Sequence, residues 1–536
     1  MSFSSAIIDK TADPSIYGYW EPIKYKFKYL PVHIALLYTG KVLAFGGSGN
    51  DPHYLNNPFP AEIFEPNEIG KDNNGKVYTI SNDGIEGDIF CAGHTFFPDG
   101  KLLIAGGTYK YDGSFVNPKL PPFSGLEHAY IFDPISLSWQ RVPNMKHGRW
   151  YPTCIMVSDG RIITMAGLSK KFPWVFLSEI EAFYNDSKEW KTMKGSNWRL
   201  PLYPRLHLLP NGEIFYAGSF NTHYVYPFIV TAFPSSTFNI NTGKWKKIGN
   251  PHNKKREEGT TVLLPLVPPH YHAKVLLIGG GTFQGDNAIS DIELIDFSSP
   301  DPKYKHIGNM KHPRYYNYAV ILPDQSILVL GGKTGKKGHH HPIHEMDKMM
   351  SKHDDGHHHH NSGELPHIDG AVLEPELYKP SENKWYPMAD MKVDRLYHSN
   401  ALLLPDGRVM TAGSNPEREK NELRIEIFNP PYLFRGERPN IHNIPENLTY
   451  GSSFEIEINN NRDEDILSVA LIHPTVTTHC VNVDQRYIEL EFDVINSKTL
   501  KSSIITNKNI IPPGYYMLFI INKKKVPSVA RFVLIN

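Results

Sequence analysis

Short hydrophobic runs that end in one or two glycines recur seven times along this chain. They occupy residues 41–47, 101–107, 161–167, 213–218, 274–280, 326–332 and 408–413. Several follow an Asp-Gly or Asn-Gly pair, at residues 99–100, 159–160, 211–212 and 406–407. Such pairs between apolar segments are typical of β-hairpins. Each run is therefore predicted to be the second strand of a hairpin, in a repeat of about 50–60 residues.

A second pair of strands follows the hairpins, for example residues 130–134 with 137–139. The sequence Tyr-Trp-Glu-Pro at 19–22 resembles the outer strand at 384–387, so residues 1–24 are expected to supply the strand that closes the last blade. An open β-solenoid is the alternative, and this match disfavours it. We predict an all-β protein. It comprises a seven-bladed kelch-type β-propeller at residues 25–435 and, where the period stops, a β-sandwich of alternating strands at 437–536.

Composition narrows the possible functions. The 536 residues contain 56 Lys+Arg and 56 Asp+Glu, so no excess charge indicates a nucleic-acid or anionic-membrane partner. No apolar run approaches the roughly 18 residues of a membrane span. Three cysteines, Cys91, Cys154 and Cys480, are too few for a disulfide framework. Cys154 is interpreted as a core residue. Cys480 follows His479 and on a strand would point to the opposite face, so it is interpreted as a packing residue.

Four short segments carry residue types that bind metals. They read Asp-Ile-Phe-Cys-Ala-Gly at 88–93, Gly-Arg-Trp-Tyr-Pro-Thr at 148–153, Asp-Arg-Leu-Tyr-His-Ser at 394–399 and Thr-Thr-His-Cys-Val-Asn-Val-Asp-Gln-Arg at 477–486. The first three precede the first strand of a hairpin, and such positions lie on one face of a propeller, around its axis. The fourth belongs to the next domain, so a loop of that domain is expected to reach the axis. In this order, the segments resemble the copper-radical oxidases, the family of galactose oxidase and glyoxal oxidase.

The resemblance implies a copper site and a protein-derived radical. Tyr151, His398 and His479 are the implied equatorial ligands of Cu(II), and Tyr397 is the implied axial ligand and general base. Cys91 would form a thioether bond to the ring of Tyr151, and the pair would carry a tyrosyl radical. Imidazole nitrogen and phenolate oxygen are donors that suit Cu(II). The implied activity is two-electron oxidation of small aldehydes, of the glyoxal or methylglyoxal type, or of primary alcohols, with O2 reduced to hydrogen peroxide.

The C-terminal segment resembles the same family. Residues 513–519 and 526–528 match the end of its immunoglobulin-like C-terminal domain. The first blade begins close to the N-terminus, as in glyoxal oxidases, without the sugar-binding domain of galactose oxidase. Galactose oxidase stacks a tryptophan on its crosslinked tyrosine. Ser169 holds that position here, so Trp174 or Trp150 is expected to cover the ring, and small aldehydes are favoured over galactose.

Other interpretations stay open. They are a galactose or alcohol oxidase of the same mechanism, a non-catalytic kelch binding module, and a metal-sequestering protein. The last is suggested by histidine runs in an insert at residues 336–367, which holds ten of the 26 histidines. We expect this insert to be disordered without metal, to overhang the copper site and to capture Cu(II) or Zn(II) there. A monomer is expected. The family is largely secreted, but residues 1–5 show no signal peptide, so the compartment is not assigned.

Overall fold

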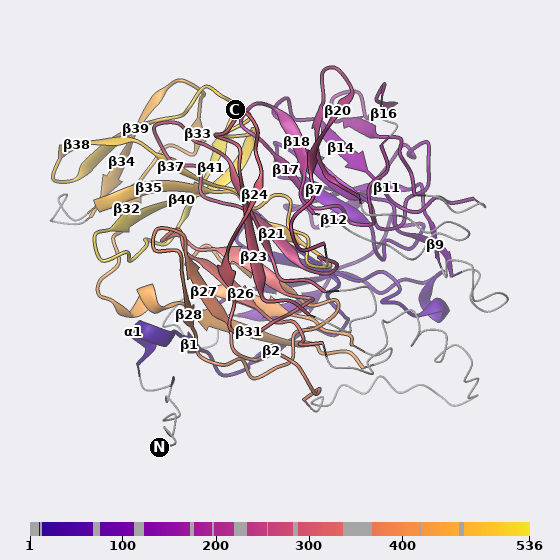
Figure 1. The fold of residues 1–536 in the computed structure, drawn as a ribbon, viewed down its shortest axis with the longest axis horizontal. Coiled ribbons are helices and arrows are strands. Elements are labelled where there is room, and N and C mark those ends of the chain that lie inside the picture. The colour runs from indigo at the N-terminus through magenta and orange to yellow at the C-terminus, as the bar shows by residue number, and fades with distance from the viewer. Residues whose placement is uncertain are drawn as a thin grey trace.

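The structure is a computed structural model that describes residues 10, 13–67, 75–111, 123–171, 176–195, 198–218, 233–254, 256–281, 288–335, 367–416, 420–459 and 466–536. Its regular structure is almost entirely β-strand, in seven successive blades and a C-terminal sandwich (Figure 1). The blades, each given from its inner to its outer strand, are β3 (His33–Leu36), β4 (Val42–Phe45), β5 (Glu62–Glu65) and β6 (Lys76–Thr79); β7 (Gly93–Phe96), β8 (Leu102–Ala105), β11 (Ala129–Asp133) and β12 (Ser138–Val142); β13 (Thr153–Met156), β14 (Ile162–Met165), β15 (Glu181–Tyr184) and β16 (Glu189–Thr192); β17 (Leu206–Leu208), β18 (Glu213–Tyr216), β19 (Ser235–Asn239) and β20 (Lys244–Gly249); β21 (Thr260–Leu263), β22 (Lys274–Ile278), β23 (Asp291–Asp296) and β24 (Tyr304–Asn309); β25 (Tyr318–Ile321), β26 (Ile327–Leu330), β27 (Glu376–Lys379) and β28 (Lys384–Pro387); and β29 (Asn400–Leu403), β30 (Val409–Ala412), β31 (Arg424–Asn429) and β1 (Tyr19–Trp20).

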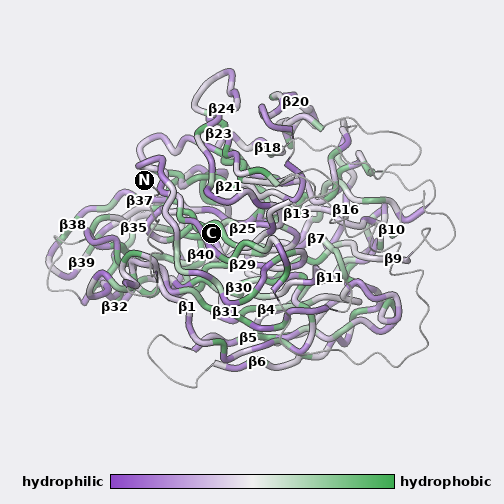
Figure 2. Tube along the Cα trace, turned by 60° about the horizontal axis from the view of Figure 1, so that its bottom comes forward, coloured by the Kyte–Doolittle hydropathy of each residue, from purple (hydrophilic) through white to green (hydrophobic). Residues whose placement is uncertain are grey.

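The inner strands are buried on both faces. Every residue of β3, β7, β13, β25 and β29 is buried, whereas the outer strand β12 alternates between exposed and buried positions. Inner strands of neighbouring blades contact one another, as β7 does with β13 and β25 with β29. The second strands β4, β8, β14, β26 and β30 are likewise buried at every residue, which explains the continuous apolar runs of the sequence. Figure 2 shows the hydrophobic stretches in interior strands such as β4 and β29.

The last blade combines segments from both ends of the propeller. β1 lies antiparallel to β31, with Tyr19 opposite Asn429 and Trp20 opposite Phe428. The indole of Trp20 donates a hydrogen bond to the Ala389 carbonyl at 2.8 Å. A second short strand, β2 (Tyr25–Lys26), also pairs with β31. The N-terminal segment thus supplies the outer strand of the blade formed by β29–β31.

Shorter elements connect and extend the blades. The helix α1 (Pro14–Tyr17) precedes β1, the 3₁₀ helix η1 (Pro52–Tyr54) follows β4, and β9 (Thr108–Tyr111) pairs with β10 (Phe123–Gly125). The 3₁₀ helix η2 (Pro431–Phe434) links β31 to the sandwich. The sandwich sheets are β32 (Ile441–Asn443), β34 (Ser453–Ile458), β39 (Thr499–Ser503) and β38 (Phe492–Asn496), and β33 (Asn447–Leu448), β41 (Arg531–Ile535), β40 (Gly514–Asn522), β35 (Ile466–Ile472) and β37 (Tyr487–Leu490).

One loop of the sandwich enters the propeller. We call residues 476–486, between β35 and β37, the axial loop. Its strand β36 (Val476–Thr477) pairs with β3 as a fifth strand of the first blade and also contacts β7 and β29. Farther along, Thr95 of β7 donates its hydroxyl to Asp484 Oδ1 at 2.7 Å, and the Gln485 amide oxygen accepts the Ile321 N–H at 2.8 Å. The loop is therefore anchored to inner strands of several blades.

Residues 336–366 of the His-rich insert lie outside the described residues, so the expected position of the insert over the metal site stays a prediction. Its flanks are described. Lys333 N donates to the Tyr315 carbonyl at 2.9 Å, and His367 Nδ1 lies 2.8 Å from Asp394 Oδ1. Both partners belong to segments that lead into inner strands, β25 and β29.

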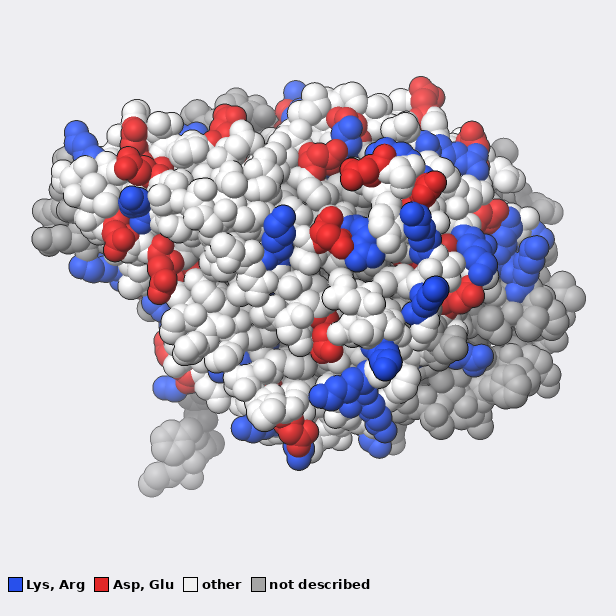
Figure 3. All heavy atoms as spheres, turned by 90° about the horizontal axis from the view of Figure 1, so that it is seen from above, with Lys and Arg blue, Asp and Glu red and all other residues white. Residues whose placement is uncertain are grey.

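The distribution of charged side chains on the surface agrees with the equal numbers of acidic and basic residues in the chain. On the face drawn in Figure 3, acidic and basic side chains are interspersed. In the part of the chain that the structure describes, no helix is long and apolar enough to cross a membrane.

Candidate metal centre

The predicted site residues of the propeller stand at corners where the chain turns into inner strands. Cys91 and Tyr151 lie just before β7 and β13, and Tyr397 and His398 lie just before β29. We call these turning points the corners of the blades. Since equivalent corners surround the axis, the three segments meet although more than 300 residues separate the first from the last.

Buried arginines hold two of these corners. Arg149, two residues before Tyr151, donates to the Glu181 carboxylate through Nε and Nη2 at 3.2 and 2.9 Å. Arg395, two residues before Tyr397, bonds Glu426 in the same way at 3.2 and 3.0 Å. All four charged side chains have no exposed area. Removing one partner would leave a buried charge unpaired, so each pair fixes the path of its corner.

The corner residues share a strained backbone conformation. In six successive blades a non-glycine residue at this point has positive φ: Cys91 (+63°), Tyr151 (+61°), Tyr203 (+45°), Glu258 (+52°), Tyr316 (+62°) and His398 (+61°). Such residues cost of order 1–3 kcal/mol each and cluster at functional sites. Backbone bonds connect neighbouring corners, from Tyr151 N to Cys91 O at 3.1 Å and from Tyr203 N to Tyr151 O at 2.9 Å. We call this arrangement the corner ring.

His479 arrives on the axial loop in a tight turn. The N–H of Val481 donates to the Thr478 carbonyl at 2.8 Å, and the two central residues, His479 and Cys480, have φ of +47° and +62°. Positive φ at both central residues is typical of a type I′ turn. Cys480 therefore lies in a turn and not on a strand. Its side chain is nevertheless buried in the hydrophobic core, and its N–H donates to the Tyr318 hydroxyl oxygen at 3.0 Å.

The structure brings the five predicted site residues together. We call Cys91, Tyr151, Tyr397, His398 and His479 the axial cluster. Cys91, His398 and His479 each offer one atom that could bind a metal, and these atoms all lie within 4.8 Å of one another; Cys91 Sγ is 3.8 Å from His479 Nε2. The hydroxyl groups of Tyr151 and Tyr397 are hydrogen-bonded to each other. One thiol, two phenols and two imidazoles from four distant segments thus lie together, with the thiol and the imidazoles buried and the phenols partly buried.

Trp150 covers the ring of Tyr151. The two rings are stacked with centroids 3.9 Å apart and an interplanar angle of 26°. Phe123 stacks on Trp150 in turn, at 4.4 Å and 11°. Trp174, the other candidate for this role, lies outside the described residues. An aromatic stack on Tyr151 is therefore present, but it comes from the adjacent residue.

The sequence analysis missed three residues of the corner ring. Tyr203 lies 4.4 Å from the Tyr151 ring and stacks on His479 at 4.7 Å. Tyr316 lies 5.3 Å from the Tyr397 ring. A sequence signal for both existed. A Tyr-Pro pair precedes β17 as it does β13, and the pattern Arg-x-Tyr recurs before β13, β25 and β29.

Glu258 is the third missed residue, and the sequence offered no comparable signal for it. Its side chain is only partly buried, as are those of Tyr151 and Tyr397. Burial raises the pKa of Tyr397 well above its usual value, and the charges of Cys91 and Glu258 add to that shift. A carboxyl group therefore lies within electrostatic reach of the predicted general base.

The donors fit a metal ion. Both ring nitrogens of His398 are buried without a hydrogen-bond partner. Burial lowers the pKa of His398 to about 3, although the neighbouring Asn415 opposes the shift, so its imidazole is neutral. Buried polar atoms are rarely left unpaired, and an ion is one common explanation. Neutral imidazoles with phenol oxygens beside them suit Cu(II).

The ring of His479 is oriented by its neighbour. The Thr478 hydroxyl donates to the Val32 carbonyl at 2.9 Å and lies 2.7 Å from His479 Nδ1. Because this hydroxyl has a single hydrogen, it accepts the Nδ1–H of His479. The lone pair of His479 is therefore on Nε2, the nitrogen nearest to Cys91. Such support of a ligand by a second residue is common at metal sites.

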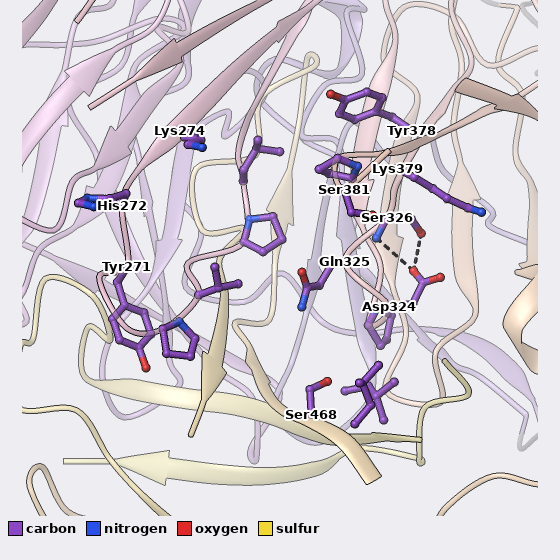
Figure 4. A pocket seen from close by; sticks show the side chains of 18 of the residues that line it. Tyr271, His272, Lys274, Asp324, Gln325, Ser326, Tyr378, Lys379, Ser381 and Ser468 are labelled. Carbon is purple, nitrogen blue, oxygen red and sulfur yellow. Dashed lines mark hydrogen bonds between the residues drawn. The ribbon is translucent and has the colours of Figure 1, made fainter. Parts of the chain in front are cut away.

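A large described cavity lies elsewhere. It measures about 540 Å³ and is enclosed by the loop from Leu264 to Lys274, the turn from Asp324 to Ser326 and residues of the sandwich such as Ser468 (Figure 4). Both propeller segments connect an inner strand to the second strand of its blade. They therefore lie at the opposite ends of the inner strands from the corners, so this cavity does not belong to the axial cluster.

These features define a class of protein: a β-propeller with a candidate metal centre on its axis, completed by a loop from a sandwich domain. Comparison with known families identifies the family to which the chain belongs. The chain belongs to the glyoxal oxidase family, since the model of the glyoxal oxidase N-terminus matches residues 74–348 and 353–432. The galactose oxidase-like early set domain matches residues 438–535.

Similar proteins carry related names. The chain is 27% identical over 490 residues to "Aldehyde oxidase GLOX" of Vitis pseudoreticulata, covering 83% of this chain and 82% of that protein. It is 24% identical over 484 residues to "Galactose oxidase" of Gibberella zeae, covering 84% of this chain and 61% of that protein. It spans only 46% of a WSC domain-containing protein of Arthroderma benhamiae, at 27% identity over 485 residues and 84% of this chain.

A solved structure shares the fold. It is a fungal alcohol oxidase of the AA5 family in complex with copper, with a TM-score of 0.76 and 22% sequence identity. The match covers 97% of this chain and 100% of that chain, so it includes both the propeller and the sandwich.

Proposed function

We propose that this protein is a copper-radical oxidase that oxidises small aldehydes or primary alcohols by two electrons and reduces O2 to hydrogen peroxide. The observation that carries the proposal is the axial cluster. A thiol, two phenols and two imidazoles lie together in a member of the glyoxal oxidase family, and the ring nitrogens of one imidazole have no hydrogen-bond partner among the described residues.

Cys91 and Tyr151 are the proposed redox-active pair. Burial raises the pKa of the Cys91 thiol well above its usual value, while an interaction with the Tyr151 hydroxyl opposes the shift, which supports a pairing of these two side chains. A bond from Sγ to the ring carbon beside the hydroxyl removes the thiol hydrogen and one ring hydrogen, and O2 takes up both as hydrogen peroxide. Sulfur at this position donates electron density, so one-electron oxidation of Tyr151 becomes easier. Trp150 shields the resulting radical by stacking on the ring.

The remaining residues would bind the metal and move protons. Tyr151, Tyr397, His398 and His479 would hold copper, which would supply a second oxidising equivalent when bound. With the metal bound, Tyr397 would be a phenolate, and its oxygen would take the hydroxyl proton of an alcohol or aldehyde hydrate. Tyr151, once oxidised to the radical, would accept a hydrogen atom from the substrate carbon. Two electrons and two protons thus leave the substrate, and O2 carries them away as hydrogen peroxide.

Hydrated aldehydes are the proposed preferred substrates. The family model and the Vitis relative named as an aldehyde oxidase support this choice. Ser169 stands where galactose oxidase has its stacking tryptophan, which argues against galactose. Glu258 is partly exposed, and its charge acts on Tyr397. We infer that its carboxyl group accepts a hydrogen bond from the second hydroxyl of an aldehyde hydrate, a group that an alcohol lacks. Peroxide release should be measured with glyoxal, methylglyoxal, primary alcohols and galactose, and a preference for galactose would contradict the assignment.

The cofactor itself can be tested by mass spectrometry. Metal-free protein exposed to Cu(II) and O2 should yield a linked peptide that contains Cys91 and Tyr151, about 2 Da lighter than the two separate peptides. The variant Cys91→Ser should give no such peptide, whereas Cys154→Ser, a change of another buried cysteine, should still form it. A wild-type protein without the linked peptide would refute the proposed cofactor.

The general base can be tested by a matched pair of tyrosine variants. Tyr397→Phe should lower turnover by roughly 10²–10⁴, because a positioned base contributes about this factor. Tyr316→Phe, in a neighbouring ring 5.3 Å away, should retain most of the activity. Equal losses in the two variants would show that Tyr397 has no special role in proton transfer.

A further inference from the structure

The first blade provides no member of the axial cluster, yet its corner contacts the segments that carry three of them. The amide of Asn400, two residues after His398, donates to the carbonyls of Pro31 and Val32 at 2.7 and 3.1 Å. The Val32 carbonyl also accepts the hydroxyl of Thr478, which orients His479. The corner of the first blade is therefore a supporting layer for the site.

His33, the first residue of β3, contacts the third segment, the one that carries Cys91. The backbone N–H of Cys91 donates to His33 Nε2 at 3.2 Å. Since Nε2 accepts this bond, the proton of the neutral imidazole is on Nδ1. The ring is completely buried and is fixed by stacking on Phe45 at 4.7 Å and by an edge contact with His94 at 5.0 Å.

The hydrogen bond acts on a strained residue. Cys91 has a φ of +63°, a conformation that non-glycine residues rarely adopt. Its side chain is fully buried, and a buried N–H without a partner would be unfavourable. The bond to His33 therefore compensates the strain at the point where the backbone directs the thiol toward Tyr151.

We propose that His33 is a positioning residue for the thioether. It holds the Cys91 backbone in the left-handed conformation that brings Sγ to the Tyr151 ring. It is not a metal ligand, because Nε2 accepts the Cys91 N–H and Nδ1 carries the proton. The inference rests on the proposed function. The bond-forming step is the one given above: the thiol and one ring C–H each lose a hydrogen, and O2 is reduced to hydrogen peroxide.

The test follows crosslink formation over time in metal-free full-length protein after addition of Cu(II) in air. His33→Phe keeps the ring that stacks on Phe45 but cannot accept the bond, so the linked peptide should form roughly tenfold more slowly, the rate equivalent of one hydrogen bond. His33→Gln places an acceptor oxygen as many bonds from Cα as Nε2 and should restore the rate. Cu(II) affinity, measured by competition with a chelator, should be unchanged in both variants.

Two further variants keep the test decisive. His94→Phe alters the neighbouring buried histidine, which does not bond Cys91, and should crosslink at nearly the wild-type rate. His33→Asn has an amide one bond too short, so it should be slow even if the phenylalanine variant does not fold. The inference is wrong if His33→Phe matches the wild type, if His33→Asn matches His33→Gln, or if His94→Phe is equally slow. A wild-type protein that never crosslinks would refute both the cofactor and the role of His33.

Discussion

Single residues of the corner ring combine backbone strain with chemistry. Glycine would relieve the positive φ at these points but would remove the thiol, phenol or imidazole that reaches the axis. The strain is offset by specific contacts, such as the hydrogen bond that Cys91 N donates to His33 and the one that Tyr203 donates from its hydroxyl to the Ala92 carbonyl at 2.8 Å. The site is thus held by neighbours that have no part in the reaction.

Among single residues, Trp150 should control the lifetime of the Tyr151 radical. Trp150→Leu removes the aromatic stack, worth about 1 kcal/mol, so the radical should decay about fivefold faster. Trp150→Phe retains an aromatic ring and should lie closer to the wild type. The measurement is the decay of the radical absorption or EPR signal in oxidised, substrate-free protein. Trp190→Leu, on the outer strand β16, serves as the control, and identical decay in all four proteins would rule out shielding by Trp150.

Among the secondary-structure elements, the axial loop is the one that completes the candidate metal site. β36 adds to the first blade by ordinary strand pairing, and the turn after it presents His479 to residues of the propeller. Neither domain contains a complete axial cluster without the other. Strand pairing fixes the register of the loop, and the Thr478 hydroxyl then fixes the tautomer of the histidine.

Loss of that hydroxyl should weaken copper binding. Thr478→Val removes the acceptor for His479 Nδ1–H, and loss of such support at metal sites typically lowers affinity by about 10–100-fold. Thr477→Val is the matched control, since the Thr477 hydroxyl bonds Asn400 Oδ1 at 2.9 Å and does not touch the imidazole. Chelator competition measures both affinities. Equal affinity in the wild type and Thr478→Val would show that the ring needs no orientation by Thr478.

For the whole molecule, the buried contact between the domains should make stability depend on pH. Burial raises the pKa of Asp484 to about 7, although hydrogen bonds from Thr95 and Phe96 oppose the shift. A carboxyl group whose pKa is higher in the folded than in the unfolded state contributes stability below its unfolded pKa of about 3.9. That contribution is lost as the pH rises through about 7.

Asp484→Asn should therefore be more stable than the wild type at pH 8, by up to a few kcal/mol, because the neutral amide needs no buried charge. The advantage should shrink steadily as the pH falls toward 4–5. Urea unfolding of the metal-free proteins at several pH values measures the difference. A variant that is less stable by the same amount at every pH would contradict the assigned shift.

The sequence by itself determined the all-β fold class, the seven hairpins and the segments that carry the axial cluster. The fold class and the hairpins follow from local patterns, namely apolar runs, Asp-Gly turns and a regular repeat, whereas the segments were recognised by their resemblance to the copper-radical oxidases. Only the tertiary structure decided which neighbours complete the site. Trp150 stacks on Tyr151, Tyr203 and Glu258 belong to the corner ring, and His33 supports Cys91. The tight turn at His479 lacks the Gly or Asn that usually marks positive φ, so no local signal predicted it. These features arise where blades and domains far apart in sequence pack around one axis, and local periodicity does not encode such contacts.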